Sequence, residues 1–297
     1  MCARNGLLRT LAFHHVWGHA PTQIEWIETA DVSAHISRRE LVQVINDLVY
    51  EQKVIYACGR YAFLEEVIRA LRCQESSIPR KRRIARCAAK WISTCSSVRF
   101  VALCNSTALG HANEESDLDF FIVTRAGTLA TTRIMATLPY KLFRRRPGEN
   151  ASEQDTICLS YFIADTGLNM ESHMLQPDDP YFRFWFLSLL PLYDDGVSRD
   201  LWRANSRITS RHPHATIWKT SPDLAVNPAV RLPVFSHLES LAVQIQRRAF
   251  PAQIREMMNA DSRVLVTPHS LKFHVNDRRD QFREQYSTFC RTHQIEI

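Results

Sequence analysis

The chain has 297 residues and a net charge of +6, and this length allows two or three small domains, each with its own core. Hydrophobic residues make up 45% and charged residues 23%, which excludes a disordered chain. The basic side chains are mostly arginine. Arginine binds phosphate through paired contacts, so a phosphate-bearing partner is one explanation of this bias, and a genome rich in G and C is the other.

The cysteines and the apolar residues are distributed as in a cytoplasmic protein. The eight cysteines are scattered without a CxxC pair, which is typical of reduced thiols and not of a disulfide framework or a zinc finger. His14, His15 and His19 interrupt the short apolar stretch near the N-terminus, so no signal peptide is predicted. No apolar run reaches the roughly 20 residues that cross a bilayer, and we expect no membrane partner.

Residues 1–78 are predicted to form a winged-helix-like module. Ser37 and Glu40 make the capping box of a helix whose apolar side chains share one face. Two short strands follow it and turn at Cys58 and Gly59. Three helices and a hairpin in this order are typical of a winged helix. The expected helices begin near residues 7, 22 and 37, and the expected strands cover residues 54–57 and 60–64.

The rest of the chain is predicted to be of the α+β class. Residues 79–176 are expected to form a small mixed β-sheet flanked by helices, and residues 177–297 a mainly helical region. A basic helix over residues 80–91 leads into the sheet. The expected strands are residues 98–103, 117–123 and 157–163, with a helix at 129–143 and a loop at 144–155 that carries Arg144, Arg145 and Arg146. Residues 264–275 are expected to be strand or loop, and 277–293 a terminal helix.

The most informative pattern is a pair of carboxylates at the start of a strand. Asp117 and Asp119 are two residues apart, so both side chains leave the same face of the strand. Two carboxylates held this close repel each other unless a cation lies between them. A hard divalent ion such as Mg²⁺, or Mn²⁺ in its place, suits oxygen ligands and leaves positions open for phosphate oxygens. A pair of such ions can also clamp the two reacting oxygens of a phosphoryl displacement.

A predicted phosphate receptor precedes this pair. An apolar strand ends at Cys104, and a short helix begins near Ser106, so a hydroxyl and free backbone N–H groups are expected side by side. Gly110 then turns the chain back toward the two aspartates. Basic residues flank the acidic segment, and Arg125 and Arg133 are the nearest candidates for phosphate contacts.

This arrangement resembles the polymerase-β-like nucleotidyltransferase superfamily, whose hallmark is a Gly-Ser pair followed by Asp-x-Asp on a strand. Ser106 matches the hallmark serine, and Asp117 and Asp119 match the two metal ligands. The resemblance implies a catalytic metal pair that transfers a nucleoside monophosphate from a triphosphate such as ATP to a hydroxyl acceptor. The segments at 157–163, 191–194 and 268–274 look like those of a largely uncharacterised bacterial group with a winged-helix-like start and a helical tail.

The chain departs from the family's pattern in two places. Asn105 stands where the family has glycine; asparagine tolerates a left-handed backbone, but its side chain would crowd a phosphate. Active members place a third carboxylate on a neighbouring strand, and residues 157–163 contain no acid. Strict alternation along that strand predicts Cys158, Ser160 and Phe162 on one face. Asp155 and Asp165 lie just beyond its two ends.

Two functional hypotheses therefore remain open. The first is a metal-dependent nucleotidyltransferase whose acceptor is a small molecule, an RNA or a protein. The second is a catalytically degenerate regulatory protein that binds nucleotide or nucleic acid. Nucleic acid would contact the basic helix at 80–90 or the third helix of the N-terminal module, where only Arg38 and Arg39 are basic.

Overall fold

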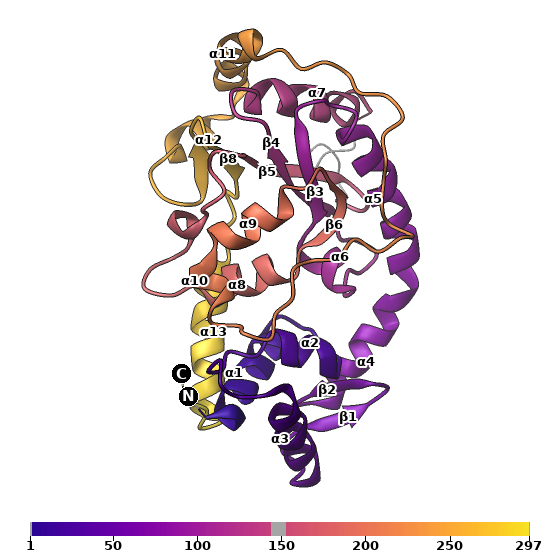
Figure 1. The fold of residues 1–297 in the computed structure, drawn as a ribbon, viewed down its shortest axis with the longest axis vertical. Helices are drawn as coiled ribbons and strands as arrows, with labels where there is room; N and C mark the ends of the chain where they lie inside the picture. Colours follow the sequence, from indigo (N-terminus) through magenta and orange to yellow (C-terminus); the bar gives the residue numbers. More distant parts are fainter. Residues whose placement is uncertain (1, 144–152, 297) are drawn as a thin grey trace.

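The computed structural model describes residues 2–143 and 153–296, so the predicted loop with Arg144, Arg145 and Arg146 lies outside the described residues. The chain is α+β, as predicted, with a mixed six-stranded sheet between two layers of helices (Figure 1). In the part of the chain that the structure describes, every helix is too short or too polar to cross a membrane.

The N-terminal segment contains the predicted three helices and a hairpin. The side chains of Thr22 and Ser37 cap the second and third helices, each with a glutamate in a complete capping box. Such caps satisfy backbone N–H groups that the first helical turn leaves without a partner. The elements are α1 (Ala3–Val16), α2 (Gln23–Glu28), α3 (Arg38–Tyr50), β1 (Ile55–Ala57) and β2 (Arg60–Ala62). Helices α4 (Glu65–Gln74) and α5 (Ile78–Ile92) then connect this segment to the sheet.

The sheet has the strand order β6-β3-β4-β5-β8-β7, and only β4 and β5 run parallel. The three strands predicted from the sequence are its centre: β3 (Val98–Leu103), β4 (Leu118–Thr124) and β5 (Ile157–Ala164). The predicted helical region supplies the other three: β6 (Leu190–Asp194), β7 (Val264–Val266) and β8 (Ser270–Phe273). Strand β6 was not predicted. It is an edge strand, which is where a sheet accepts a proline such as Pro191.

Each face of the sheet has its own core. Phe120 and Ile122 of β4 point to the face covered by α5, α7 (Leu129–Leu142) and α12 (Ala252–Met257). Phe121 and Val123 point to the opposite face, in keeping with the alternation of a strand. That second face is covered by α8 (Pro180–Leu187), α9 (Ser198–Ala204) and α10 (Ser206–Thr209). Helix α11 (Glu239–Ala249) packs on α7.

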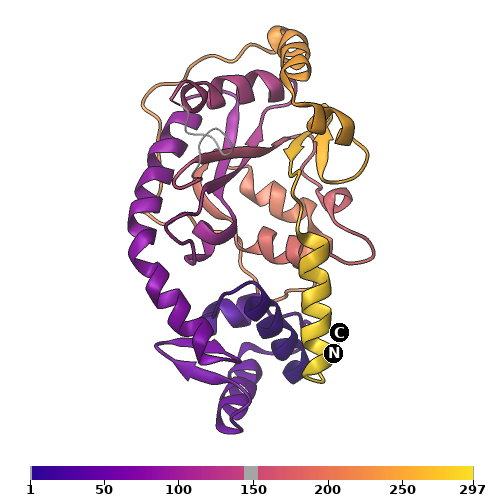
Figure 2. The same cartoon turned by 180° about the vertical axis from the view of Figure 1, so that it is seen from behind.

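The two ends of the chain lie together and close against α8. Helix α13 (Arg279–Thr292) packs beside α1 in both views (Figures 1 and 2). The ring of Phe13 stacks on Phe184 with centroids 4.0 Å apart, and Tyr286 meets Phe13 edge-on. These buried rings hold the N-terminal segment against α8, and Trp17 of the same cluster lines the pocket that contains Asp117.

We expect Phe13→Ala to lower the free energy of unfolding by about 3–5 kcal/mol, because it leaves a cavity between α1, α8 and α13. Denaturant unfolding of the full chain measures this. Phe235, which is half exposed, gives the matched control, and Phe235→Ala should cost less than about 1 kcal/mol. Equal losses for the two variants would show that the aromatic contact between α1 and α8 contributes little to stability.

Candidate functional site

Asp117 and Asp119 open into one pocket with Ser106. The pocket has a volume of about 500 Å³, within the usual range for a small-molecule site. Short helix α6 (Asn105–Leu109), the start of β4, and β8 with the segment that follows all line it. The side chains that line the pocket include Trp17, Asn105, Ser106, Asp117, Asp119, Cys158, Ser160, Tyr181, Lys272, Asp277, Arg278, Arg279 and Phe282.

Asn105 is tied to the carboxylate pair. Its backbone is left-handed, with φ of 56°, the conformation that asparagine tolerates best after glycine. Its Nδ2 donates to Oδ2 of Asp119 over 2.7 Å, and the Tyr181 hydroxyl donates to its Oδ1 over 3.2 Å. The side chain that was expected to crowd a phosphate is therefore held against Asp119, and both Asn105 and Ser106 line the pocket.

The surroundings of Asp117 and Asp119 disfavour the ionised form of both carboxyl groups. Burial, and then the charge of Asp119, raise the pKa of Asp117 to about 8. Burial also raises the pKa of Asp119, although hydrogen bonds from Asn105 and Cys158 act in the opposite direction. Burial and like charge both favour the neutral form of an acid. A bound divalent cation would reverse this preference, because it attracts both carboxylates at once.

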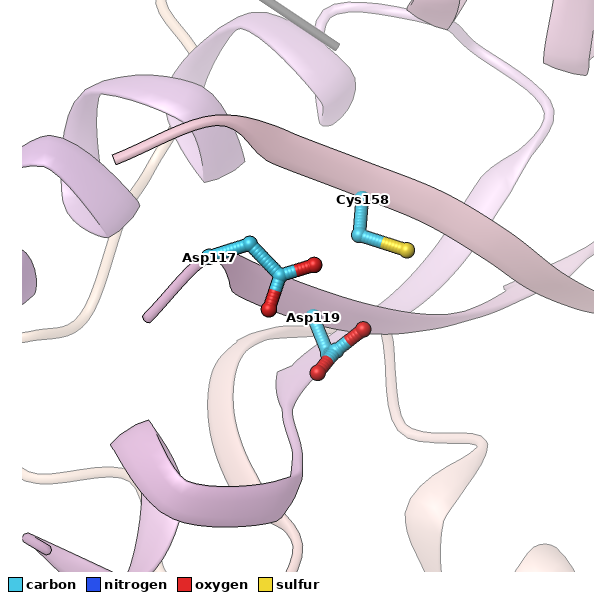
Figure 3. A group of neighbouring side chains, drawn as sticks. All are labelled: Asp117, Asp119 and Cys158. Carbon is cyan, nitrogen blue, oxygen red and sulfur yellow. The ribbon is translucent and has the colours of Figure 1, made fainter. Parts of the chain in front are cut away.

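Cys158 lies beside the carboxylate pair, on the neighbouring strand β5. It is the register partner of Asp119 across the parallel β4–β5 pair. One donor atom from each of Asp117, Asp119 and Cys158 lies within 4.8 Å of the other two (Figure 3). A register shift then follows in β5, so Tyr161 joins this face and Phe162 turns to the other core. Strict alternation predicted that Cys158, Ser160 and Phe162 share one face of β5. This prediction is confirmed for Cys158 and Ser160, and it is wrong for Phe162 because a bulge adds one residue to the strand.

The two acids at the ends of β5 have partners elsewhere. Asp155 pairs with Arg80 at 2.7 Å and with Lys81 at 3.0 Å. Asp165 pairs with Arg99 at 3.2 Å and accepts from the backbone N–H of Ala126. Neither lines the pocket, so neither is placed as the third carboxylate.

Helix α5 holds the loop that leads into Asp117. Lys81 is fully buried, and its Nζ donates to the backbone oxygens of Ser116 and Glu114 and to Asp155. Arg80 bonds the Glu114 carboxylate. The prediction of a solvated face is confirmed for Arg83, Arg86 and Lys90, which are exposed. Arg80 and Lys81 in the first turn instead anchor the loop before the carboxylates.

The other predicted residues lie outside the pocket. Arg125 is at the far end of β4, about 20 Å from Asp119 at the rise of a strand, and is 3.7 Å from Asp195. Arg133 donates to Gln246, and its guanidinium covers the Phe273 ring. Gly110 has φ of 76° and ends α6. Among the described residues, the pocket lining includes none of these three.

The basic residues that line the pocket come instead from a part of the chain in which the sequence predicted no site residue. Lys272 is buried, donates to the backbone oxygen of Ser262, and has its pKa lowered to about 7 by burial and then by Arg279. Arg279 is held by Asp179 and Asp277, and Arg278 is exposed at the mouth. The only signal in the sequence was the segment at 268–274, which carried part of the family resemblance.

The donor set fits a divalent cation, since two carboxylates and a thiol are all known ligands of such ions. In the part of the chain that the structure describes, this is the one group of three such side chains close enough to share an ion. Comparison of the chain with family models, curated proteins and solved structures gave no match.

Metal ions should stabilise the protein more at pH 8 than at pH 6. The pKa of Asp117 is raised on folding, so its ionisation destabilises the metal-free fold. That cost is absent below its ordinary pKa near 4 and grows as the pH rises toward 8. A cation at 100 times its Kd adds about 2.7 kcal/mol when it binds only the folded state. Unfolding with and without Mn²⁺ at both pH values measures the difference.

The matched variants for this measurement are Asp117→Asn and Glu115→Gln, the second at an exposed position two residues earlier. Asp117→Asn should lose the metal effect and should be no less stable than wild type without metal at pH 8. Glu115→Gln should behave as wild type. Undiminished stabilisation of Asp117→Asn by Mn²⁺ would contradict the assignment of the metal site.

Lys81→Met should cost about 1–3 kcal/mol of unfolding free energy, because it leaves the backbone oxygens of Ser116 and Glu114 without their buried donor, while Asp155 keeps its pair with Arg80. It should also reduce the stabilisation by Mn²⁺, since the loop before Asp117 loses its anchor. Lys90→Met, at an exposed position on the same helix, is the control. If the two variants lose equal amounts of stability, the anchoring role is wrong.

Proposed function

We propose that this chain is a metal-dependent nucleotidyltransferase of the polymerase-β-like type, transferring a nucleoside monophosphate from a nucleoside triphosphate to a hydroxyl acceptor. The observation that carries the proposal is that one pocket is lined by both carboxylates and cations. Asp117 and Asp119 line it together with Lys272 and Arg278. A metal–triphosphate requires carboxylates that bind the divalent ion and, beside them, cations that bind the phosphates.

The roles of the residues follow from their places in the pocket. Asp117 and Asp119 would hold Mg²⁺ or Mn²⁺, which shields the phosphate charges. The Ser106 hydroxyl would donate to a phosphate oxygen, and Lys272 and Arg278 would bind the terminal phosphates. Trp17, Tyr181 and Phe282 line the same pocket, and their rings offer a surface on which a base can stack.

The chemistry is a displacement at the α-phosphorus. An acceptor oxygen forms the new bond, the bond to the bridging oxygen breaks, and pyrophosphate leaves while its charge is held by Lys272 and Arg278. The acceptor's proton passes to solvent, because among the described residues a thiol, not a third carboxylate, lies beside the aspartate pair. Catalysis here would depend on positioning and charge stabilisation.

A second candidate, a nucleotide-responsive regulator without turnover, is favoured by one observation. Cys158 is the register partner of Asp119 on β5, and β5 contains no acid, whereas active members of the family that the chain resembles carry a third carboxylate on a neighbouring strand. The element order of the N-terminal segment is that of a winged helix, which would bind nucleic acid in this view. Its third helix is poorly suited to reading DNA, because Arg38 donates to the backbone oxygen of His214.

Incubation of the full chain with Mn²⁺ or Mg²⁺ and each labelled triphosphate tests the proposal. We expect release of pyrophosphate and a labelled acceptor with one or more triphosphates. Asp119→Asn should reduce turnover by about 100-fold or more, since the metal supplies several kcal/mol of charge stabilisation. Lys272→Met should weaken binding of the triphosphate about tenfold, the value of one charged hydrogen bond.

Glu115→Gln is the control and should leave both quantities unchanged. Metal-dependent binding without turnover of any triphosphate would favour the regulator. Binding that persists in Asp119→Asn and Lys272→Met would show that the nucleotide occupies another site.

A further inference from the structure

The third donor beside the aspartates is a thiol, and this sets which ion the pocket prefers. Figure 3 shows Cys158 on β5, on the same face of the sheet as the carboxylates of Asp117 and Asp119. Oxygen ligands and water suit Mg²⁺, whereas thiolate is a soft ligand that suits Zn²⁺. A site with two oxygens and one sulfur therefore favours Zn²⁺ over Mg²⁺ more strongly than a site with three carboxylates does.

We propose that Asp117, Asp119 and Cys158 together bind a thiophilic divalent ion, Zn²⁺ in preference to Mg²⁺, with the Cys158 thiolate as the third ligand. The inference rests on the proposed function only in using the same pocket. It concerns the choice of metal, which can be measured without nucleotide. On binding, the Zn–S bond forms and the thiol proton leaves to solvent, so the charges balance without a change of oxidation state.

The distances are compatible with a shared ion. Zinc lies about 2.3 Å from sulfur and about 2.0–2.2 Å from carboxylate oxygen, so two ligands of one ion are at most about 4.5 Å apart. The three donor atoms already lie within 4.8 Å of one another, so small side-chain rotations bring them into range. The thiol also contacts the Ser160 hydroxyl at 3.3 Å, a neighbour that can orient the sulfur.

The position of Cys158 in the sheet makes the assignment specific. Its backbone is paired with Asp119 in the centre of the sheet, so the sulfur cannot move far from the carboxylates. Cys104 is also buried nearby and feels the charge of Asp119, but it is not among the three donors that converge. One cysteine of the eight is thus placed as a ligand.

Cobalt reports this bond directly, because a Co²⁺–thiolate bond gives a charge-transfer absorption in the near ultraviolet that oxygen ligands do not give. The reduced, metal-free full chain is titrated with Co²⁺ and the bound cobalt is then displaced with Zn²⁺ or Mg²⁺. We expect the charge-transfer band to appear with one equivalent, to be lost with stoichiometric Zn²⁺, and to survive a large excess of Mg²⁺. Cys158→Ser should abolish the band and weaken Zn²⁺ binding about 100-fold or more, beyond the loss of an outer-shell contact.

Cys87→Ser, at an exposed thiol on α5, is the matched control and should keep the band. Cys158→Asp supplies the missing carboxylate and should shift the preference toward Mg²⁺ by about tenfold or more, with no band. Circular dichroism shows whether each variant folds. A band that persists in Cys158→Ser, or wild-type protein that binds Mg²⁺ as tightly as Zn²⁺, would overturn the inference.

Failure of this inference and failure of the proposed function give different results. Triphosphate binding with Mg²⁺ but no Cys158-dependent cobalt band would leave the proposed function in place and remove the thiolate ligand. A Cys158-dependent band without binding of any triphosphate would keep the metal site and remove the nucleotidyltransferase.

Discussion

The carboxylates of Asp117 and Asp119, held on one face of a strand in a partly buried pocket, are the constraint on which the rest of the site depends. Burial raises the pKa of both aspartates, and the charge of Asp119 raises that of Asp117 further, so the pair is unfavourable without compensation. The surroundings supply only part of it, through the amide of Asn105 and the rigid loop held by Lys81. Binding of the proposed divalent cation would remove this cost, because it attracts both carboxylates at once.

The pocket around this pair is assembled from segments that are far apart in the chain. Trp17 comes from the N-terminal segment, Tyr181 from α8 and Lys272 from β8. Their relative positions depend on the stacking of Phe13 on Phe184 and on the packing of α13 beside α1. The N-terminal segment and the C-terminal helix therefore contribute to the pocket through tertiary packing, whether or not the hairpin also contacts nucleic acid.

The features that sequence could reveal are the local ones. The spacing of Asp117 and Asp119 determines a common face, and Ser106 follows a strand directly, so both could be located from pattern alone. Arg125 was selected because it is near in sequence, but a strand carries each residue about 3.3 Å further away. Lys272 was missed because its pairing across β5 and β8 is a long-range contact, and periodicity contains no information on it. The bulge in β5 could not be predicted either, because it depends on how β5 pairs with β4.

Cys158 separates two properties that a third carboxylate combines. A carboxylate in that place ligates the metal and can also take the proton of an attacking hydroxyl. A metal-bound thiolate keeps the first property, while its electron pair is engaged by the ion and its basicity falls. The basic side chains of Lys272 and Arg278 do not depend on this residue, so binding of a triphosphate should survive the change. Under the proposed function, recognition of the triphosphate would thereby be less affected than its conversion, and the identity of the bound ion would determine how much charge stabilisation remains for the chemical step.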